Sequence, residues 1–197
     1  INFNSNFDYD INANISNTAD SLDGCITIYD STIENLNFNI NNGVCEDGLN
    51  IVRSEGNINK INILNSFKDG LDMDFSSIKI NQIEVDESGN DCVDMSFGNY
   101  KIYSLNLNKC KDNAVSIGEK SNLISDNLNV KNSLNALAVK DSSKVYLKSL
   151  FSKNNNFCFK LYNKKQEFLG GELKLNKLVC DSKYTIDKNS YFKNNEF

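Results

Sequence analysis

Short segments of alternating hydrophobic and polar residues recur along this chain every 22 residues. They begin at Asp47, Asp69, Asp91, Asn113, Asn135 and Phe157 and read DGLNI, DGLDM, DCVDM, NAVSI, NALAV and FCFKL. The third and fifth positions are apolar in every copy, and successive side chains of a strand point to opposite faces. Each segment therefore predicts a short β-strand with one buried face.

A second apolar cluster follows in each repeat. Its members are Ile58, Ile61 and Ile63, then Ile80, Ile83 and Val85, then Ile102, Leu105 and Leu107, and, after a slip of about one residue beyond Ser121, Val145, Leu147 and Leu150. A spacing of two and a richness in Ile, Val, Asn and Gly disfavour helices. None of these strands can bury its apolar face alone, so the repeats must stack.

We therefore predict an all-β fold, a single-stranded right-handed parallel β-helix with about 22 residues per coil and about seven or eight coils. A leucine-rich repeat is the nearest alternative, because its period overlaps. That repeat requires a Leu-rich consensus with a fixed Asn, which this chain lacks.

The repeat also sets the expected domain limits. An imperfect early copy begins at Asp23 and a degenerate last copy near Cys180. We predict one domain over residues 1–197, with an N-terminal cap at 1–22, coils at 23–180 and a C-terminal cap at 181–197. The first residue is Ile and no signal-peptide pattern follows, so we expect a mature product or a piece of a larger protein.

The second position of each repeat holds only small residues, which predicts a tight corner. These residues are Gly48, Gly70, Cys92, Ala114, Ala136 and Cys158. The six cysteines are even in number, which permits disulfides in a secreted protein. Cysteine also packs well as a small apolar residue, and we expect buried thiols ahead of disulfides. The abundant Asn fits corners that need left-handed backbone and can hydrogen-bond from coil to coil.

Composition excludes several functions. The net charge is -5 and no basic stripe is present, so we expect no nucleic-acid partner. The apolar runs are too short to cross a bilayer, so we expect no membrane insertion. The chain has no His and no CxxC pair, so the usual zinc sites are absent.

Carboxylates gather on one face of the predicted solenoid, because residues 22 apart stack about 4.8 Å from each other. The candidate catalytic residues are Asp69, Asp72, Asp91 and Asp94. Crowding of like charges should raise one pKa, and a protonated acid beside an ionised one is what glycoside hydrolysis uses. Calcium is the candidate metal, at Asp72, Asp74 and Asp94. No other cofactor is expected.

An alternative interpretation needs no ligand. The corner residues Asp47, Asp69 and Asp91 are placed to cap backbone N–H groups of the neighbouring coil. That interpretation is weaker for Asp72 and Asp94, which lie in mid-strand and point outward.

Candidate substrate-binding residues surround the carboxylates. They are Asp74, Phe75, Phe97, Glu119, Lys140 and Asp141. Phe75 and Phe97 share a column and form either a sugar-binding platform or a cluster tucked under a turn. Lys140 either binds an anionic sugar or neutralises its acidic neighbours.

The repeats from Lys68 to Lys140 resemble successive coils of polygalacturonases, over roughly residues 67–142. The resemblance implies a β-helix that hydrolyses acidic polysaccharide with inversion. It matches Asp69 to the first catalytic Asp, Asp91 to the second member of an Asp pair and Lys140 to a substrate-binding Lys. The chain departs from the family at Asn90, Asn113 and Ala138, which replace the acid, the His and the Arg of its motifs.

A second resemblance covers most of the chain. Segments such as VSIGEKS at 115–121, KDSS at 140–143 and KKQEF at 164–168 are similar to the β-helix that accompanies CotH-type kinase-like domains of bacterial surface proteins. This resemblance implies an accessory module of a larger extracellular protein.

Two functions are consistent with these patterns. The first is a secreted or cell-surface module that binds or processes polysaccharide through its acidic face, as a hydrolase or lyase if it is an enzyme. The second is a structural or adhesive module without chemistry of its own. The fold does not decide between them.

Overall fold

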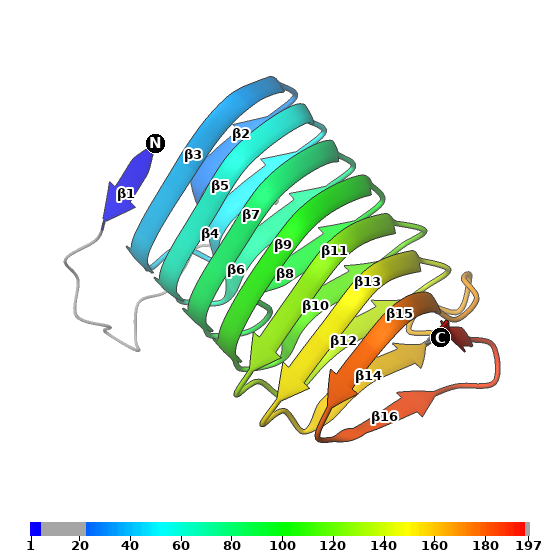
Figure 1. The fold of residues 1–197 in the computed structure, drawn as a ribbon. Coiled ribbons are helices and arrows are strands. Elements are labelled where there is room, and N and C mark those ends of the chain that lie inside the picture. The colour runs from blue at the N-terminus through cyan, green and yellow to red at the C-terminus, as the bar shows by residue number, and fades with distance from the viewer. Residues whose placement is uncertain (5–22, 196–197) are drawn as a thin grey trace.

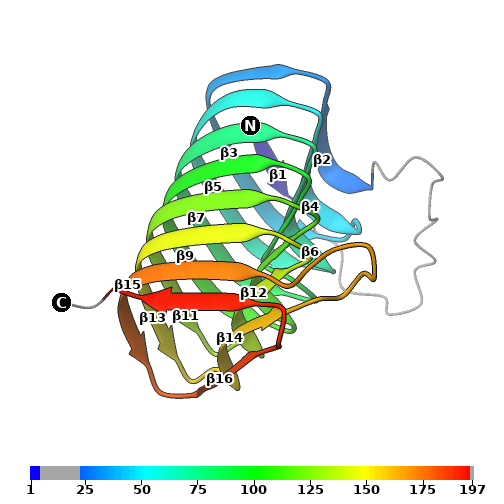
Figure 2. The same ribbon diagram turned by 90° about the vertical axis from the view of Figure 1, so that its right-hand side faces the viewer.

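The chain folds as a right-handed parallel β-solenoid of about eight turns, with about 22 residues per turn (Figures 1 and 2). The computed structural model describes residues 1–4 and 23–195, and within them every regular element is a strand. The predicted fold class is therefore confirmed. No helix in these described ranges is long and apolar enough to cross a membrane.

Two parallel sheets wrap the core. The nine-stranded sheet contains β1 (Asn2–Asn4), β3 (Thr32–Gly43), β5 (Glu55–Ser66), β7 (Ser77–Ser88), β9 (Asn99–Cys110), β11 (Asn122–Lys131), β13 (Lys144–Lys153), β15 (Glu172–Cys180) and β17 (Tyr191–Asn194). The eight-stranded sheet contains β2 (Gly24–Tyr29), β4 (Asp47–Val52), β6 (Asp69–Asp74), β8 (Val93–Ser96), β10 (Asn113–Gly118), β12 (Asn135–Lys140), β14 (Phe157–Tyr162) and β16 (Lys183–Ile186).

The register follows the sequence repeat. Leu71 lies opposite Val93, which lies opposite Val115, and all three are fully buried. The slip after Ser121 is also confirmed, since Asn99 pairs with Asn122, 23 residues on. The early copy begins one residue later than expected, because Gly24 rather than Asp23 lies opposite Asp47.

The ends of the chain continue the two-sheet pattern. β16 and β17 add one strand to each sheet, within the segment expected to cap the C-terminus. Most of the expected N-terminal cap, residues 5–22, lies outside the described residues.

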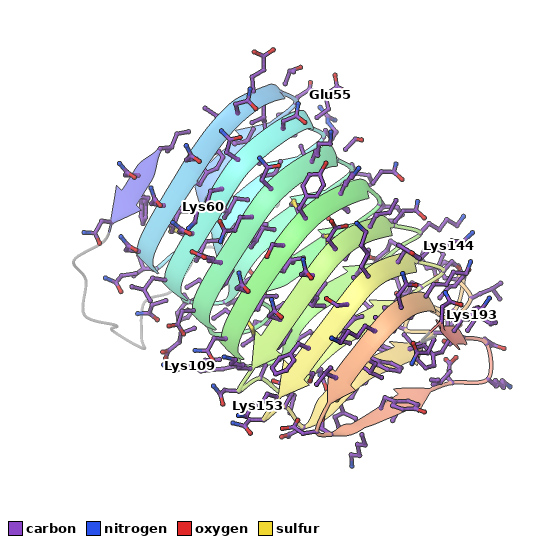
Figure 3. The ribbon with its side chains drawn as sticks, viewed as in Figure 1. Glu55, Lys60, Lys109, Lys144, Lys153 and Lys193 are labelled. Atoms are coloured by element: carbon purple, nitrogen blue, oxygen red, sulfur yellow. A yellow bond between two sulfur atoms is a disulfide. The ribbon has the colours of Figure 1, made fainter. Side chains whose placement is uncertain are left out.

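Asparagine has the two roles that the sequence predicted. Asn42, Asn65 and Asn132 take left-handed backbone conformations at one corner, with φ of 54°, 62° and 55°. Amide ladders join the coils, as where the Asn62 side chain donates to the Asn39 side chain at 2.9 Å. The outer face of the nine-stranded sheet carries many polar side chains together with exposed hydrophobic ones such as Ile124 and Phe151. On this face Lys60 pairs with Glu84 at 2.8 Å (Figure 3).

The expectation of buried thiols was wrong, because all six cysteines form disulfides. The pairs are Cys25–Cys45, Cys92–Cys110 and Cys158–Cys180. In each pair the partners come from neighbouring coils and meet at one corner, with Cα atoms 5.2, 5.4 and 6.2 Å apart. These separations lie within the range that a disulfide spans. A corner that admits only small side chains therefore also brings these pairs into bonding distance.

Replacing Cys92 and Cys110 together with Ala should lower the free energy of unfolding by roughly 3 kcal/mol, because the bond closes a short loop in the unfolded chain. Urea denaturation followed by circular dichroism measures the change. Thiol titration of the unreduced parent, unfolded in denaturant, should find no free thiol. Six titratable thiols in that sample would contradict the disulfide assignment.

Candidate functional site

The predicted carboxylate patch lies on the outer face of the eight-stranded sheet. Asp72 of β6 lies opposite Asp94 of β8, and Asp74 lies opposite Ser96. The side chains of Asp72, Asp74 and Asp94 are half-buried. Stacking of equivalent coils thus brings these three carboxylates together, as the register predicted.

The corner carboxylates serve the backbone of the next coil. Asp69 accepts hydrogen bonds from the Asp91 N–H and the Asn90 side chain, both at 2.8 Å. Asp91 accepts from the Asn113 N–H at 2.7 Å and the Asn113 side chain at 2.8 Å. The backbone-capping interpretation therefore describes the contacts of Asp69 and Asp91, two of the four candidate catalytic residues.

Burial disfavours the ionised form of Asp69, Asp72, Asp74 and Asp91 and so raises their pKa values. It is the main cause that raises the pKa of Asp91 to about 7 and of Asp69 and Asp74 to about 6, and neighbouring carboxylates raise these values further. The pKa of Asp72 is raised well above its usual value for the same reasons. The predicted rise is confirmed in direction, but burial contributes more than the charge crowding from which it was inferred.

Lys140 borders the patch, and a glycine makes room for it. The Lys140 stem lies over Gly118, where an added Cβ would come within 2.9 Å of the Lys140 Cε atom. Its ammonium donates to the Ser116 hydroxyl at 2.8 Å. Burial alone would lower the pKa of Lys140, but the charges of Asp94 and Asp91 outweigh it and raise the pKa. Lys140 therefore neutralises this end of the row.

Phe75 and Phe97 form an exposed aromatic ladder beside the carboxylates. Their rings are parallel within 3° with centroids 4.8 Å apart, and the side chains are 55% and 43% exposed. Both residues have left-handed backbones, with φ of 50° and 51°. Phe168 meets Phe97 edge-on, with ring centroids 6.5 Å apart. The ladder is thus open to solvent, with one neighbouring loop against it.

Glu119 and Asp141 continue the Phe75–Phe97 column but are buried. Glu119 accepts from the Ser96 hydroxyl at 2.8 Å and pairs with Lys165 at 2.6 Å. Burial would raise the pKa of Glu119, but these two contacts outweigh it and lower the pKa. The Asp141 carboxylate accepts the Lys164 and Lys165 N–H groups at 2.7 and 2.8 Å. Both acids therefore contact a loop rather than solvent.

That loop, residues 163–169, brings Lys165 and Phe168 to the site. Both lie in the KKQEF segment, but neither was among the predicted site residues. The signal for this loop is a spacing of 28 residues between paired positions of β13 and β15, where Lys144 lies opposite Glu172. The longer spacing leaves extra residues that form a loop projecting from the corner between β14 and β15 (Figure 2).

In residues 1–4 and 23–195, no three His, Cys, Asp or Glu side chains are arranged to hold a metal ion. Calcium at Asp72, Asp74 and Asp94 stays a prediction. A groove of about 890 Å³ lies elsewhere, on the nine-stranded sheet, where Asn62, Glu84 and Asn106 are among its lining residues. A smaller hollow of about 380 Å³ borders Phe75 and Phe97.

Replacing Asp91 with Asn should stabilise the fold at pH 8 by roughly 2 kcal/mol. The pKa of Asp91 is about 7 when folded and 3.8 ordinarily, so the folded chain holds the extra proton between these values. The stability that the raised pKa of Asp91 contributes is fully present below pH 4 and is lost as the pH rises through 7. Urea denaturation at pH 5 and pH 8 should show a smaller pH dependence in the variant. An unchanged pH dependence would contradict the assignment.

Comparison with known proteins gave no match to any protein-family model, to any curated protein or to any solved structure. Neither the polygalacturonase resemblance nor the CotH-type resemblance is supported by these comparisons. The chain is therefore assigned to the parallel β-solenoids by its architecture alone.

Proposed function

We propose that the outer face of the eight-stranded sheet around β6 and β8 binds polysaccharide, and that the chain is a carbohydrate-binding module of a secreted or surface protein. The observation that carries the proposal is the exposed Phe75–Phe97 ladder beside the half-buried carboxyls of Asp72, Asp74 and Asp94. Aromatic side chains contact the apolar C–H groups of sugars, and carboxyls hydrogen-bond to their hydroxyls.

Folding does not account for Phe at these two corners. A bulky side chain in the left-handed region is unfavourable, and Asn or Gly would suit the backbone better. Burial does not compensate, because about half of each side chain remains in water. Mutual stacking of the rings offsets part of this unfavourable conformational free energy. The left-handed backbone belongs to the corner itself, since Glu119 and Asp141 of the same column share it. The choice of Phe at these positions, and not the backbone conformation, supports a role for the ladder in binding.

The raised pKa values of Asp72 and Asp74 suit these two carboxyls to neutral sugar hydroxyls. With its pKa raised to about 6, Asp74 is partly protonated in mildly acidic solution, and Asp72 shifts in the same direction. A protonated carboxyl both donates and accepts hydrogen bonds, as a hydroxyl does. A row of such groups offers both functions to a glycan with less desolvation cost than a row of ionised groups.

Binding is favoured over hydrolysis. Asp69 and Asp91, the positions matched to polygalacturonase catalytic residues, are occupied in capping backbone N–H groups. Asn90 stands where that family has its acid. A reducing-end assay on any bound glycan tests for hydrolysis, and turnover in that assay would move the proposal from binding to catalysis.

The three disulfides support an extracellular setting, because such bonds persist in oxidising compartments. The alternative function is a structural or adhesive accessory module of the CotH-like kind. The capping bonds of Asp69 and the positive charge of Lys140 near Asp94 and Asp91 favour this alternative, since both stabilise the fold without any ligand.

Replacing Phe75 and Phe97 together with Asn should weaken glycan binding by roughly tenfold or more while preserving the fold, because Asn is better suited to the left-handed corners. Binding is measured on an array containing cello-, chitosan- and galacturonan-oligosaccharides, followed by calorimetry. The matched control is Phe151→Asn, a partly exposed Phe in an Asn-rich column of the nine-stranded sheet. Equal losses in both variants, or no binding by the parent, would reject the proposal.

Replacing Asp72 and Asp94 together with Ala should abolish the same binding, because an Ala side chain can neither donate nor accept a hydrogen bond. The fold should be preserved, because both side chains lie on the outer face of the sheet. The measurement is repeated in calcium and in EDTA. Loss of parent binding in EDTA would support the calcium prediction. If the double variant binds as tightly as the parent, the carboxylates do not form part of the site.

A further inference from the structure

The column that carries the aromatic ladder is accessible for only part of its length. Its successive members Phe75, Phe97, Glu119 and Asp141 lie on neighbouring coils and share φ values of 50°, 51°, 51° and 53°. Their exposed fractions fall from 55% and 43% to 6% and 0%. The column is therefore covered from the coil of β10 onward.

The 163–169 loop provides the cover, and it is fixed in place. Asp141 holds its backbone through the N–H groups of Lys164 and Lys165. The Asn163 side chain donates to the carbonyls of Lys165 and Phe168 at 2.8 and 2.6 Å. At the far end of the loop, Leu169 and Ser142 are joined by two hydrogen bonds of 2.8 Å. With these contacts the 163–169 loop forms a fixed wall at this end of the column.

Two loop side chains reach back toward the ladder. Lys165 pairs with Glu119, the residue that follows Phe97 in the column. The Phe168 ring meets the edge of Phe97, and the Lys120 ammonium lies 5.6 Å from the centroid of the Phe168 ring. The loop thus ends the exposed aromatic edge directly beside Phe97.

The column of Asp72 and Asp94 is accessible over these two coils. Its neighbours on either side, Asn50 and Ser116, are both buried, so the open end of the face is set by the corner column. In the neighbouring column Gly118 lies beneath the Lys140 stem. In the other direction the corner column stays open, since Arg53 and Asp30 are exposed.

We infer that the 163–169 loop closes one end of the proposed binding face, so that the site accepts the end of a glycan chain and not an internal stretch. This inference rests on the proposed function. A chain laid along the solenoid axis over Phe75 and Phe97 meets Phe168 and Lys165 one coil further on. It can enter only from the Arg53 side, with its terminal sugar against the wall.

The experiment measures binding stoichiometry by calorimetry, using hexasaccharides of the cello, chitosan and galacturonan series and two soluble polymers of matching linkage that differ severalfold in length. For whichever series binds, the inference predicts one protein per hexasaccharide and an unchanged number of proteins per polymer chain when the polymer is longer. A number that rises in proportion to length would overturn the inference and leave the proposed function standing. Failure of every series to bind would overturn both.

Two loop variants test the same inference, so that it does not rely on the parent protein alone. Deleting residues 164–169 restores the 22-residue spacing, and it should allow several proteins to bind each long polymer chain. Lys165→Ala with Phe168→Ala should act in the same direction if the deletion does not fold. The matched control is Leu169→Ala, because Leu169 is 68% exposed in the same loop. Unchanged length dependence in both variants would contradict the wall.

Discussion

Hydrogen bonding between parallel coils in a fixed register is the constraint on which the rest of this structure depends. Each strand between the ends of its sheet pairs with its equivalents on both sides, so each strand side chain lies next to the side chain one repeat away. Apolar columns stack into a continuous core, where Leu71, Val93 and Val115 are fully buried. Polar side chains one repeat apart are stacked in the same way, even where their charges repel each other.

This constraint explains both the stability of the corners and the properties of the acidic face. Asn columns become hydrogen-bonded ladders, and corner Asp residues become caps for the next coil. Asp72 and Asp94 are forced together by the same geometry, and burial then raises the pKa of Asp72. Lys140 relieves part of the charge because Gly118 leaves space for its stem. The face is thus a mixture of residues that serve the fold and residues that the fold does not need.

The repeat made most of the fold predictable, because a period of 22 residues defines which side chains share a column. It predicted correctly that Asp72 lies opposite Asp94 and that Phe75 stacks on Phe97. It did not reveal the disulfides, because the separation of the partners varies: 20 residues for Cys25–Cys45, 18 for Cys92–Cys110 and 22 for Cys158–Cys180. Their proximity depends on how a corner closes in three dimensions.

The repeat also did not predict where the accessible part of the aromatic column ends. Glu119 and Asp141 share the aromatic column, and the sequence predicted that they would face a substrate. The inserted loop buries both, because Lys165 pairs with Glu119 and the loop backbone donates to Asp141. Periodicity describes what the coils have in common, whereas a loop that interrupts it packs according to its own contacts.

One strand register brings the acidic and aromatic side chains onto the face where we propose that glycan binds. A crystal structure of the chain grown with whichever hexasaccharide binds is the decisive measurement. It should show Asp72 beside Asp94 on adjacent strands, with sugar density against Phe75 and Phe97 that ends at Phe168. Sugar density on the nine-stranded sheet, or a pairing that separates Asp72 from Asp94, would refute this placement.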